Sequence, residues 1–203
     1  MRLRINYAFA LLLTIAAAFA TAPCFGQSGP ATEKPLRGEL AFGYSYLHSN
    51  APPGGCGCFS LNGGNATFAL PIGASRFSVV GDVTVTHSGA VTSAGDSLTL
   101  STFMAGARYR PHFGHSRFQP FGQVLIGLAH ASGSLAEGQN PASANAGAAF
   151  AGQAGGGVDL HASRRFSIRL VEADYLATEF DNGGNDHQNN VRITTGVVIH
   201  FGQ

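Results

Sequence analysis

The chain has 203 residues and a formal charge of +1, and only 11% of its residues are charged, whereas an average soluble domain has about 25%. The near-neutral balance gives no electrostatic reason to expect nucleic-acid binding. After residue 26 no apolar run is long enough for a membrane helix, and the length of that part suits one domain. If the chain enters a membrane there, it must do so through strands.

The first residues have the pattern of a secretory signal peptide. Arg2 and Arg4 give a positive start, an apolar run covers residues 8–20, and small residues lead to Gly26. The run is too short to span a bilayer, which takes about 20 residues. We therefore expect a signal peptide that is cleaved near Gly26.

This cleavage site divides the chain into a signal peptide at 1–26, a short periplasmic segment at 27–36 and one domain at 37–203. Two alternatives remain open. One is cleavage after the small-residue motif at 18–20. The other is a lipoprotein signal that ends at Cys24, although "TAPC" is a poor match to the acylation motif.

Eight segments of the domain alternate between apolar and polar residues, the period-2 pattern of β-strands. In the last of them, "NNVRITTGVVIHF", valine and isoleucine occupy one face almost to the end. The segments cover residues 37–49, 58–71, 76–88, 97–111, 117–131, 147–161, 166–180 and 189–201.

The connections between these segments alternate in length. Those after the first, third, fifth and seventh are longer and rich in Gly, Ser, Asn and Ala, for example "SGSLAEGQNPASANA", whereas "IGAS" and "ASRR" are tight. Long loops at one end and short periplasmic turns at the other are typical of outer-membrane barrels. The sequence therefore predicts an all-β fold, an eight-stranded antiparallel transmembrane up-and-down β-barrel.

The polar faces of the strands are mostly Gly, Ser, Thr and Gln with isolated charges, which suits a narrow interior better than the charged solvent face of a soluble sandwich or lipocalin. An isolated charge inside a barrel must be paired, because an unpaired buried charge is costly. Parity within the strands places five charged residues in the lumen: Glu39, Asp82, Arg108, Asp159 and Arg192.

The seventh segment conflicts with simple alternation. Arg169 is odd-numbered, whereas Glu172 and Asp174 are even-numbered. All three face the lumen only if a β-bulge falls near residues 170–171. We therefore predict that bulge, together with a lumenal ion-pair network that includes these three residues.

Several stretches resemble the small outer-membrane barrel family related to the OmpA transmembrane domain and OmpX, among them "TFMAGARYRP", "FQPFGQVLIGLAHA" and "NNVRITTGVVIHFG". The resemblance implies a monomer in the bacterial outer membrane that contacts lipid. The chain lacks Trp, so its interfacial aromatic girdle must use Tyr and Phe. The candidates are Tyr44, Tyr46, Phe103, Tyr109, Phe121, Tyr175 and Phe201.

The same resemblance implies two roles for particular residues. Members of the family end in a signal for the barrel-assembly machinery, to which the final strand is similar at Thr194, Gly196, Ile199 and Phe201. In OmpA-like barrels an inward acid before the sixth connection and an inward Arg after it belong to an ion-pair network considered to be a gate. Asp159 and Arg169 occupy those positions, opposite each other if the turn is centred on Arg164.

Cysteine and histidine residues add little specific chemistry. Cys56 and Cys58 form a Cys-x-Cys pair near the first long connection, which an oxidising compartment favours as a disulfide, with a free dithiol as the alternative. No spacing of His residues indicates a metal site. We expect no metal, no cofactor and no nucleic acid as a partner.

Catalysis requires a nucleophile, a base and a group that orients the base. "HAS" occurs at His130–Ser132 and at His161–Ser163, and the first has only Glu137 as a possible third member. Short motifs of this kind arise by chance. The sequence therefore favours a non-enzymatic structural or surface-interaction role, in which the loops contact an unknown extracellular ligand. A narrow channel for small solutes or ions is the alternative, and a lipid A-modifying enzyme is the weaker one.

Overall fold

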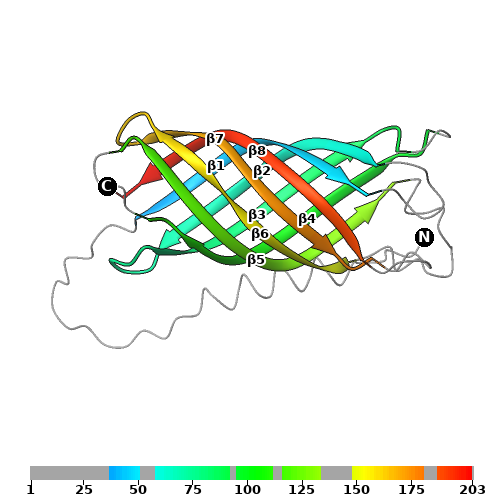
Figure 1. Cartoon of the computed structure of the whole chain (residues 1–203), viewed down its shortest axis with the longest axis horizontal. Coiled ribbons are helices and arrows are strands. Elements are labelled where there is room, and N and C mark those ends of the chain that lie inside the picture. The colour runs from blue at the N-terminus through cyan, green and yellow to red at the C-terminus, as the bar shows by residue number, and fades with distance from the viewer. Residues whose placement is uncertain are drawn as a thin grey trace, which may run out of the picture. The chain divides into compact units, whose positions relative to one another are not determined.

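The computed structural model describes residues 37–50, 58–91, 95–111, 116–133, 148–180 and 187–202. The expected signal peptide and the 27–36 segment lie outside the described residues. No helix in the described part is long and apolar enough to cross a membrane. The eight strands are β1 (Gly38–Ser49), β2 (Phe59–Pro71), β3 (Phe77–Ser88), β4 (Leu98–Tyr109), β5 (Phe118–Ser132), β6 (Ala148–His161), β7 (Phe166–Thr178) and β8 (Gln188–Phe201) (Figure 1).

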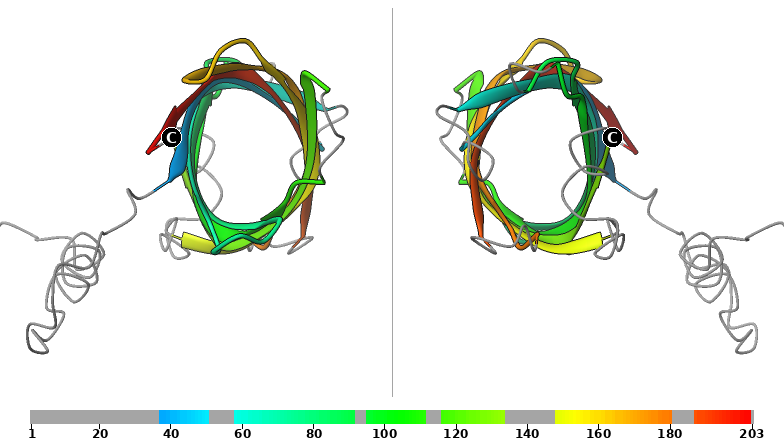
Figure 2. Two further views of the ribbon diagram at one scale, coloured as in Figure 1. Left: turned by 90° about the vertical axis from the view of Figure 1, so that its left-hand side faces the viewer. Right: turned by 90° about the vertical axis from the view of Figure 1, so that its right-hand side faces the viewer.

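Each strand pairs antiparallel with the next in sequence, and β8 pairs with β1 from Gly38↔Phe201 to Ser49↔Asn190. This last pairing closes the sheet, so that no strand edge is left with unpaired backbone groups. Figure 2 shows the strands as a closed ring. The predicted eight-stranded up-and-down barrel is therefore confirmed.

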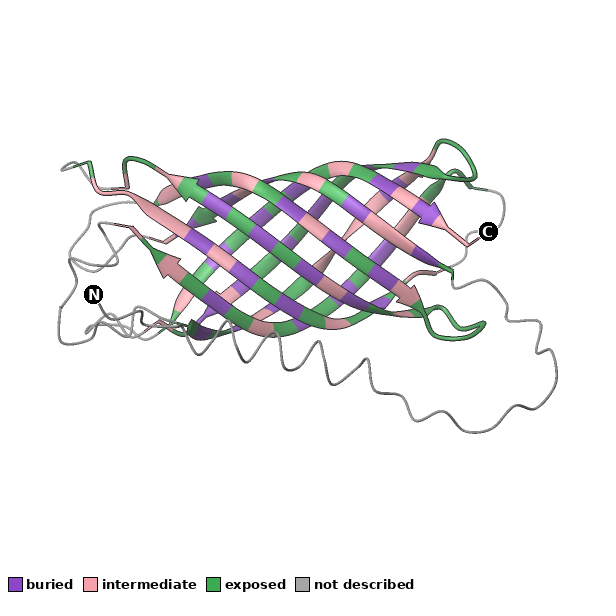
Figure 3. Ribbon diagram, turned by 180° about the vertical axis from the view of Figure 1, so that it is seen from behind, coloured by how far each residue is buried: buried purple, intermediate pink, exposed green. Residues whose placement is uncertain are grey.

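The two faces of every strand differ as the period-2 pattern predicts. Exposed and buried residues alternate along the strands in Figure 3. On β5, Val124, Ile126 and Leu128 are exposed on the outer wall, whereas Gln123 and Leu125 are buried inside. The outer wall is apolar because it faces lipid, and the interior carries the polar and charged side chains.

The barrel has two different ends, which we call the turn end and the loop end. The turn end carries the connections 72–76, 110–117 and 162–165. Gly73 lies in the first of these with φ of 59°, a left-handed conformation that glycine adopts without a steric penalty. The loop end carries the longer connections, 50–58, 89–97, 133–147 and 179–187.

The predicted bulge is present on β7. Val158 pairs with Val171, and the next residue of β6, Asp159, pairs with Arg169, so that Leu170 is an extra residue on β7. The β7–β8 register shifts at the same place, between Arg169 and Glu172. The bulge turns Arg169 to the same side of the sheet as Glu172, which simple alternation would not allow.

Candidate functional site

The centre of the lumen holds two arginines that share one carboxylate. Arg169 Nη1 donates to Glu172 Oε2 at 2.5 Å, and Arg192 Nη2 donates to Glu172 Oε1 at 3.1 Å. Glu172 has no exposed surface. A carboxylate between two guanidiniums has most of its lone pairs satisfied, which offsets the cost of removing the charge from water.

Arg192 also connects β8 to β3 across the lumen. Its Nη1 donates to Asp82 Oδ1 at 2.8 Å and to Thr84 Oγ1 at 2.6 Å, and its Nη2 donates to Asp174 Oδ2 at 3.0 Å. Thr67 donates a further hydrogen bond to Asp82 at 2.7 Å. The bonds from Arg192 to Asp82 and Thr84 join β8 to β3 through the interior, whereas those to Asp174 and from Thr67 join adjacent strands.

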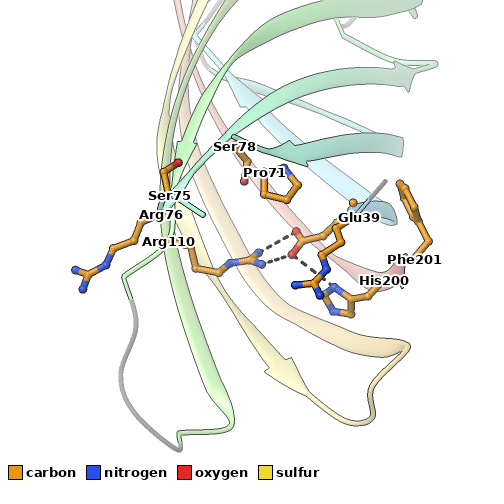
Figure 4. Close-up of a pocket in the computed structure, with 10 residues that line it drawn as sticks. Glu39, Pro71, Ser75, Arg76, Ser78, Arg110, His200 and Phe201 are labelled. Carbon is orange, nitrogen blue, oxygen red and sulfur yellow. Dashed lines mark hydrogen bonds and ion pairs between the residues drawn. The ribbon is translucent and has the colours of Figure 1, made fainter. Parts of the chain in front are cut away.

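Toward the turn end the network continues through Asp159. Its carboxylate accepts from Arg169 Nε at 2.9 Å and from Arg110 Nη2 at 2.9 Å. Arg110 also forms a two-point contact with Glu39, and the His200 imidazole lies 3.5 Å from the same carboxylate of Glu39 (Figure 4). His200 Nε2 is 2.8 Å from Ser167 Oγ.

Arg108 contacts the neutral side chains of Gln123 and Phe121 in addition to the carboxylate of Glu39. Its Nη2 donates to Gln123 Oε1 at 2.8 Å, and its guanidinium carbon lies 4.3 Å from the centre of the Phe121 ring. The guanidinium of Arg169 lies 4.6 Å from the same ring. Gln123 Nε2 donates to Glu172 at 2.9 Å. Phe121 and Gln123 therefore link Arg108 to the central pair.

The structure brings together all of the charged residues that parity and the bulge placed inside. They are Glu39, Asp82, Arg108, Asp159, Arg169, Glu172, Asp174 and Arg192. Sequence reasoning missed Arg110, Gln123 and His200. Arg110 is two residues after Arg108 and so shares its face, which was the available signal, but it lies just beyond the end of β4.

Phe121 corrects the predicted aromatic girdle. It is buried in the lumen against the guanidiniums, with only 5% of its surface exposed. The reason is parity: Phe121 lies on the same face of β5 as Gln123. The other girdle candidates are on the outer wall, where Tyr44 donates to Asn62 and Tyr175 donates to Asn189. A girdle at the membrane interfaces stays a prediction for the other candidates, Tyr44, Tyr46, Phe103, Tyr109, Tyr175 and Phe201.

A second, apolar layer lies mainly on the loop-end side of the lumen. Its buried residues pack in one cluster that draws on every strand from β1 to β7. They are Leu47, Leu61, Ala69, Val80, Leu100, Met104, Leu125, Ala129, Ala151 and Leu176. Gln153 is buried with them in register between Leu125 and Leu176, and its amide group makes no hydrogen bond within the described residues.

The two layers fill the middle of the lumen along the described strands. Asp159 and Glu172 have 0% exposure, and Leu61 and Leu125 have 1%. A cavity of about 390 Å³ lies at the turn end, where Glu39, Arg110 and His200 line it together with Pro71 and Ser75 (Figure 4). The interior is therefore a packed core with a polar vestibule at one end.

Comparisons with known proteins agree with this architecture. No family model and no curated protein matches the chain by sequence. Neisserial surface protein A (NspA) superposes with a TM-score of 0.64 at 13% identity, over 81% of this chain and 97% of that chain. The fold is that of a small outer-membrane β-barrel. Ail, the attachment invasion locus protein of Yersinia pestis, superposes with a TM-score of 0.52 at 15% identity, over 82% of this chain and 99% of that chain.

The two "HAS" motifs lie at opposite ends of the barrel, the first where β5 ends and the second where β6 ends. His130 is exposed on the outer wall, and Glu137 lies outside the described residues. His161 instead lies 3.5 Å from Ser167 Oγ, with its ring near that of His200. No group of three or more potential metal ligands occurs among the residues that the structure describes.

The remaining candidates are the predicted assembly signal on β8, which pairs with β1, and the two cysteines near the 50–58 loop. Phe201, in the proposed assembly signal, stacks on Phe68 of β2 with ring centroids 6.0 Å apart. Thr194 is buried, and Gly196 pairs with Gly43. Cys58 is exposed, and its predicted disulfide partner Cys56 lies outside the described residues, so the disulfide stays a prediction.

Proposed function

We propose that the chain is a non-enzymatic outer-membrane protein that acts at the cell surface through its loop end, with a lumen closed to ions at rest. The packed lumen is the observation that carries this proposal. An ion that entered from the turn end would meet a layer of buried ion pairs and then a layer of buried aliphatic side chains. Hydrophobic constrictions exclude water and ions even when they are not fully closed.

The outer wall and the lumen have structural roles in this proposal. The apolar wall contacts lipid, and the ion-pair network holds the strands together from inside. The loop end is then left for contact with an extracellular ligand, and loops on a rigid scaffold are common binding elements. The two structural neighbours carry names of surface proteins, one of them for attachment and invasion, which agrees with a role at the surface.

Two measurements test this proposal. An epitope inserted within 134–147 should be accessible to antibody on intact cells, whereas the same epitope within 72–76 should be accessible only after the cells are opened. The purified barrel in a planar bilayer should give no steady single-channel current. Labelling of the second insertion on intact cells would reverse the orientation, and a steady current would contradict the closed lumen.

A narrow, gated pore is the second candidate, and the turn-end vestibule favours it. The cavity reaches Glu39 and Arg110, so polar space extends from the mouth to the edge of the ion-pair network. Conduction would then require the network to exchange partners and the apolar layer to move. Short bursts of current, in place of a flat baseline, would favour this alternative.

A further inference from the structure

An Arg–Phe dipeptide recurs at the start of three strands that run from the turn end. In each case Phe is the first residue of the strand and Arg is the residue before it. The dipeptides are Arg76–Phe77 at β3, Arg117–Phe118 at β5 and Arg165–Phe166 at β7. The first strand of this set, β1, is preceded by Arg37. The repeat places one arginine at the turn end of every second strand around the barrel.

The backbone shows that the three arginines occupy equivalent positions. The carbonyl oxygen of Arg76 accepts the amide of Arg110 at 2.9 Å. The carbonyl oxygen of Arg117 accepts the amide of His161 at 2.8 Å, and that of Arg165 accepts the amide of His200 at 2.8 Å. Each arginine is thus joined to the adjacent strand at the edge of the barrel, next to another basic residue.

The phenylalanines face outward and the arginines lie beyond them. Phe77, Phe118 and Phe166 are 50%, 54% and 49% exposed on the outer wall. Arg76 lines the vestibule, but its guanidinium extends away from Glu39 in Figure 4, and its Nη1 lies 3.4 Å from the Tyr109 hydroxyl. The Tyr109 ring is in turn 5.1 Å from Phe77. At this site a guanidinium and two rings lie together on the outer surface at the turn end.

Charge is separated along the axis of the barrel. The turn-end connections 72–76, 110–117 and 162–165 contain arginines and no acid, whereas the loop-end connections contain acids and no Lys or Arg. The turn-end arginines are Arg37, Arg76, Arg110, Arg117, Arg164 and Arg165, and the loop-end acids are Asp96, Glu137, Glu179, Asp181 and Asp186. Among the described residues, the two acids nearest the turn end are Glu39 and Asp159, and both already have arginine partners inside the lumen.

We propose that the repeated Arg–Phe pairs form a binding rim for the phosphate groups of anionic phospholipids in the leaflet around the turn end. The guanidinium fork matches phosphate geometry, and an anionic membrane surface attracts each nearby Arg by about fivefold in affinity. A ring beside the arginine is buried in the interface as aromatic belts are. That ring distinguishes a lipid headgroup from a soluble anion, because a soluble anion would not need an apolar neighbour.

The proposal depends on the membrane-spanning fold and not on the proposed role of the loop end. Because the chain contains no Trp, a single introduced Trp can report the lipid beside one position. Phe118→Trp places this reporter beside Arg117, and Phe150→Trp places it on the outer wall at the loop end of β6, where Phe150 is also exposed. Both variants are reconstituted as the full chain in bilayers of phosphatidylcholine and phosphatidylglycerol, with either lipid brominated to quench Trp fluorescence.

We expect brominated phosphatidylglycerol to quench the reporter at position 118 several-fold more effectively than its share of the bilayer predicts, and to quench the reporter at position 150 in proportion to that share. Adding Arg117→Gln should reduce the preference at position 118 by about fivefold for one lost cation, and high salt should weaken it. Arg117→Lys should retain part of the preference. A Phe166→Trp and Arg165→Gln pair repeats the test at the next site if the first reporter fails to fold.

If brominated phosphatidylglycerol quenched the reporter at position 118 only in proportion to its share of the bilayer, the proposal would be overturned. Inorganic phosphate at constant ionic strength should leave the preference intact. If it abolished the preference, the rim would be a site for soluble anions instead of lipid. An equal preference at position 150 would also overturn the proposal, because it would then be a property of the whole barrel and not of the Arg–Phe rim. Unchanged gel mobility before heating shows that each variant is folded.

Discussion

Asp159 on β6 lies directly opposite Arg169 on β7, and its carboxylate accepts two hydrogen bonds from that guanidinium, at 2.9 and 3.3 Å. The bulge at Leu170 allows Glu172 to join this pair, because without it Arg169 and Glu172 would face opposite sides of the sheet. Each member has a second partner: Arg110 for Asp159 and Glu172 for Arg169. Loss of one member therefore leaves the other paired, but with one contact fewer.

A double-mutant cycle on Asp159→Ala and Arg169→Ala should show coupling. Breaking a buried pair typically costs about 3 to 5 kcal/mol, and we expect each single change to fall at the lower end because a second partner remains. The double variant should recover about 0.5 to 3 kcal/mol relative to the sum. The free energy of unfolding in urea, followed by gel mobility, measures this. Strict additivity would show that the pair does not interact in the folded barrel.

Two lumenal glutamines should respond oppositely to the same substitution. Gln153 is buried without a hydrogen bond in the described residues, whereas the Gln123 side chain bonds to Arg108, Glu172 and Asp174. Leaving buried polar groups unpaired costs about 1 to 3 kcal/mol. Gln153→Met should therefore raise the free energy of unfolding by about 1 kcal/mol, and Gln123→Met should lower it by at least as much. The same sign for both would mean that Gln153 is hydrogen-bonded in the membrane.

Phe121→Leu should destabilise the barrel more than Phe118→Leu. Phe121 lies over two buried guanidiniums, and desolvated cation–π contacts contribute up to about 2 kcal/mol each. Phe118 faces lipid, where leucine is nearly as favourable. Urea unfolding of the two variants compares them directly, and equal losses would remove the energetic role that we give to Phe121.

The strands and their faces could be predicted from sequence because the period of two is a local property. The conflict between Arg169 and Glu172 even located the bulge. Contacts across the lumen could not be predicted in this way. Arg192 reaches Asp82 from β8 to β3, and that approach depends on closure and on the stagger of all eight strands, neither of which a single strand specifies.

Two errors of prediction have simpler causes. Phe121 was assigned to the girdle because aromatic residues are common there, although its parity with Gln123 already placed it inside. Arg110 was missed because it lies after the last paired residue of β4, where alternation is normally no longer applied. The amide of Arg110 still bonds to the carbonyl of Arg76, so its side chain keeps the inward direction of the strand.

Deletion of residues 199–203 should prevent stable insertion. It removes the partners of Gly38 and Leu40 on β1 and of Phe166 on β7, which opens the barrel at its turn end. Backbone groups left unpaired in lipid cost several kcal/mol each. Immunoblots of outer-membrane fractions should show little protein, and Phe201→Tyr, which keeps the aromatic ring, should insert normally. Wild-type levels of the truncated chain would contradict a role for these residues in assembly.

The last prediction concerns the two layers of the lumen, which form barriers in series. We expect each layer to block ions by itself, so removal of one layer should leave the conductance near its baseline. Arg169→Ala removes one of the two arginines at the centre of the ion-pair layer, and Leu61→Ser places a hydroxyl in the apolar layer. Each single variant in a planar bilayer should be as quiet as the parent chain. The double variant should conduct, because water can then enter both layers.

Leu170→Ala is the matched control for Arg169→Ala, since it truncates the adjacent residue on the lipid side. Conductance in Leu61→Ser alone would show that the ion-pair layer is already permeable, and a silent double variant would show that other side chains close the lumen.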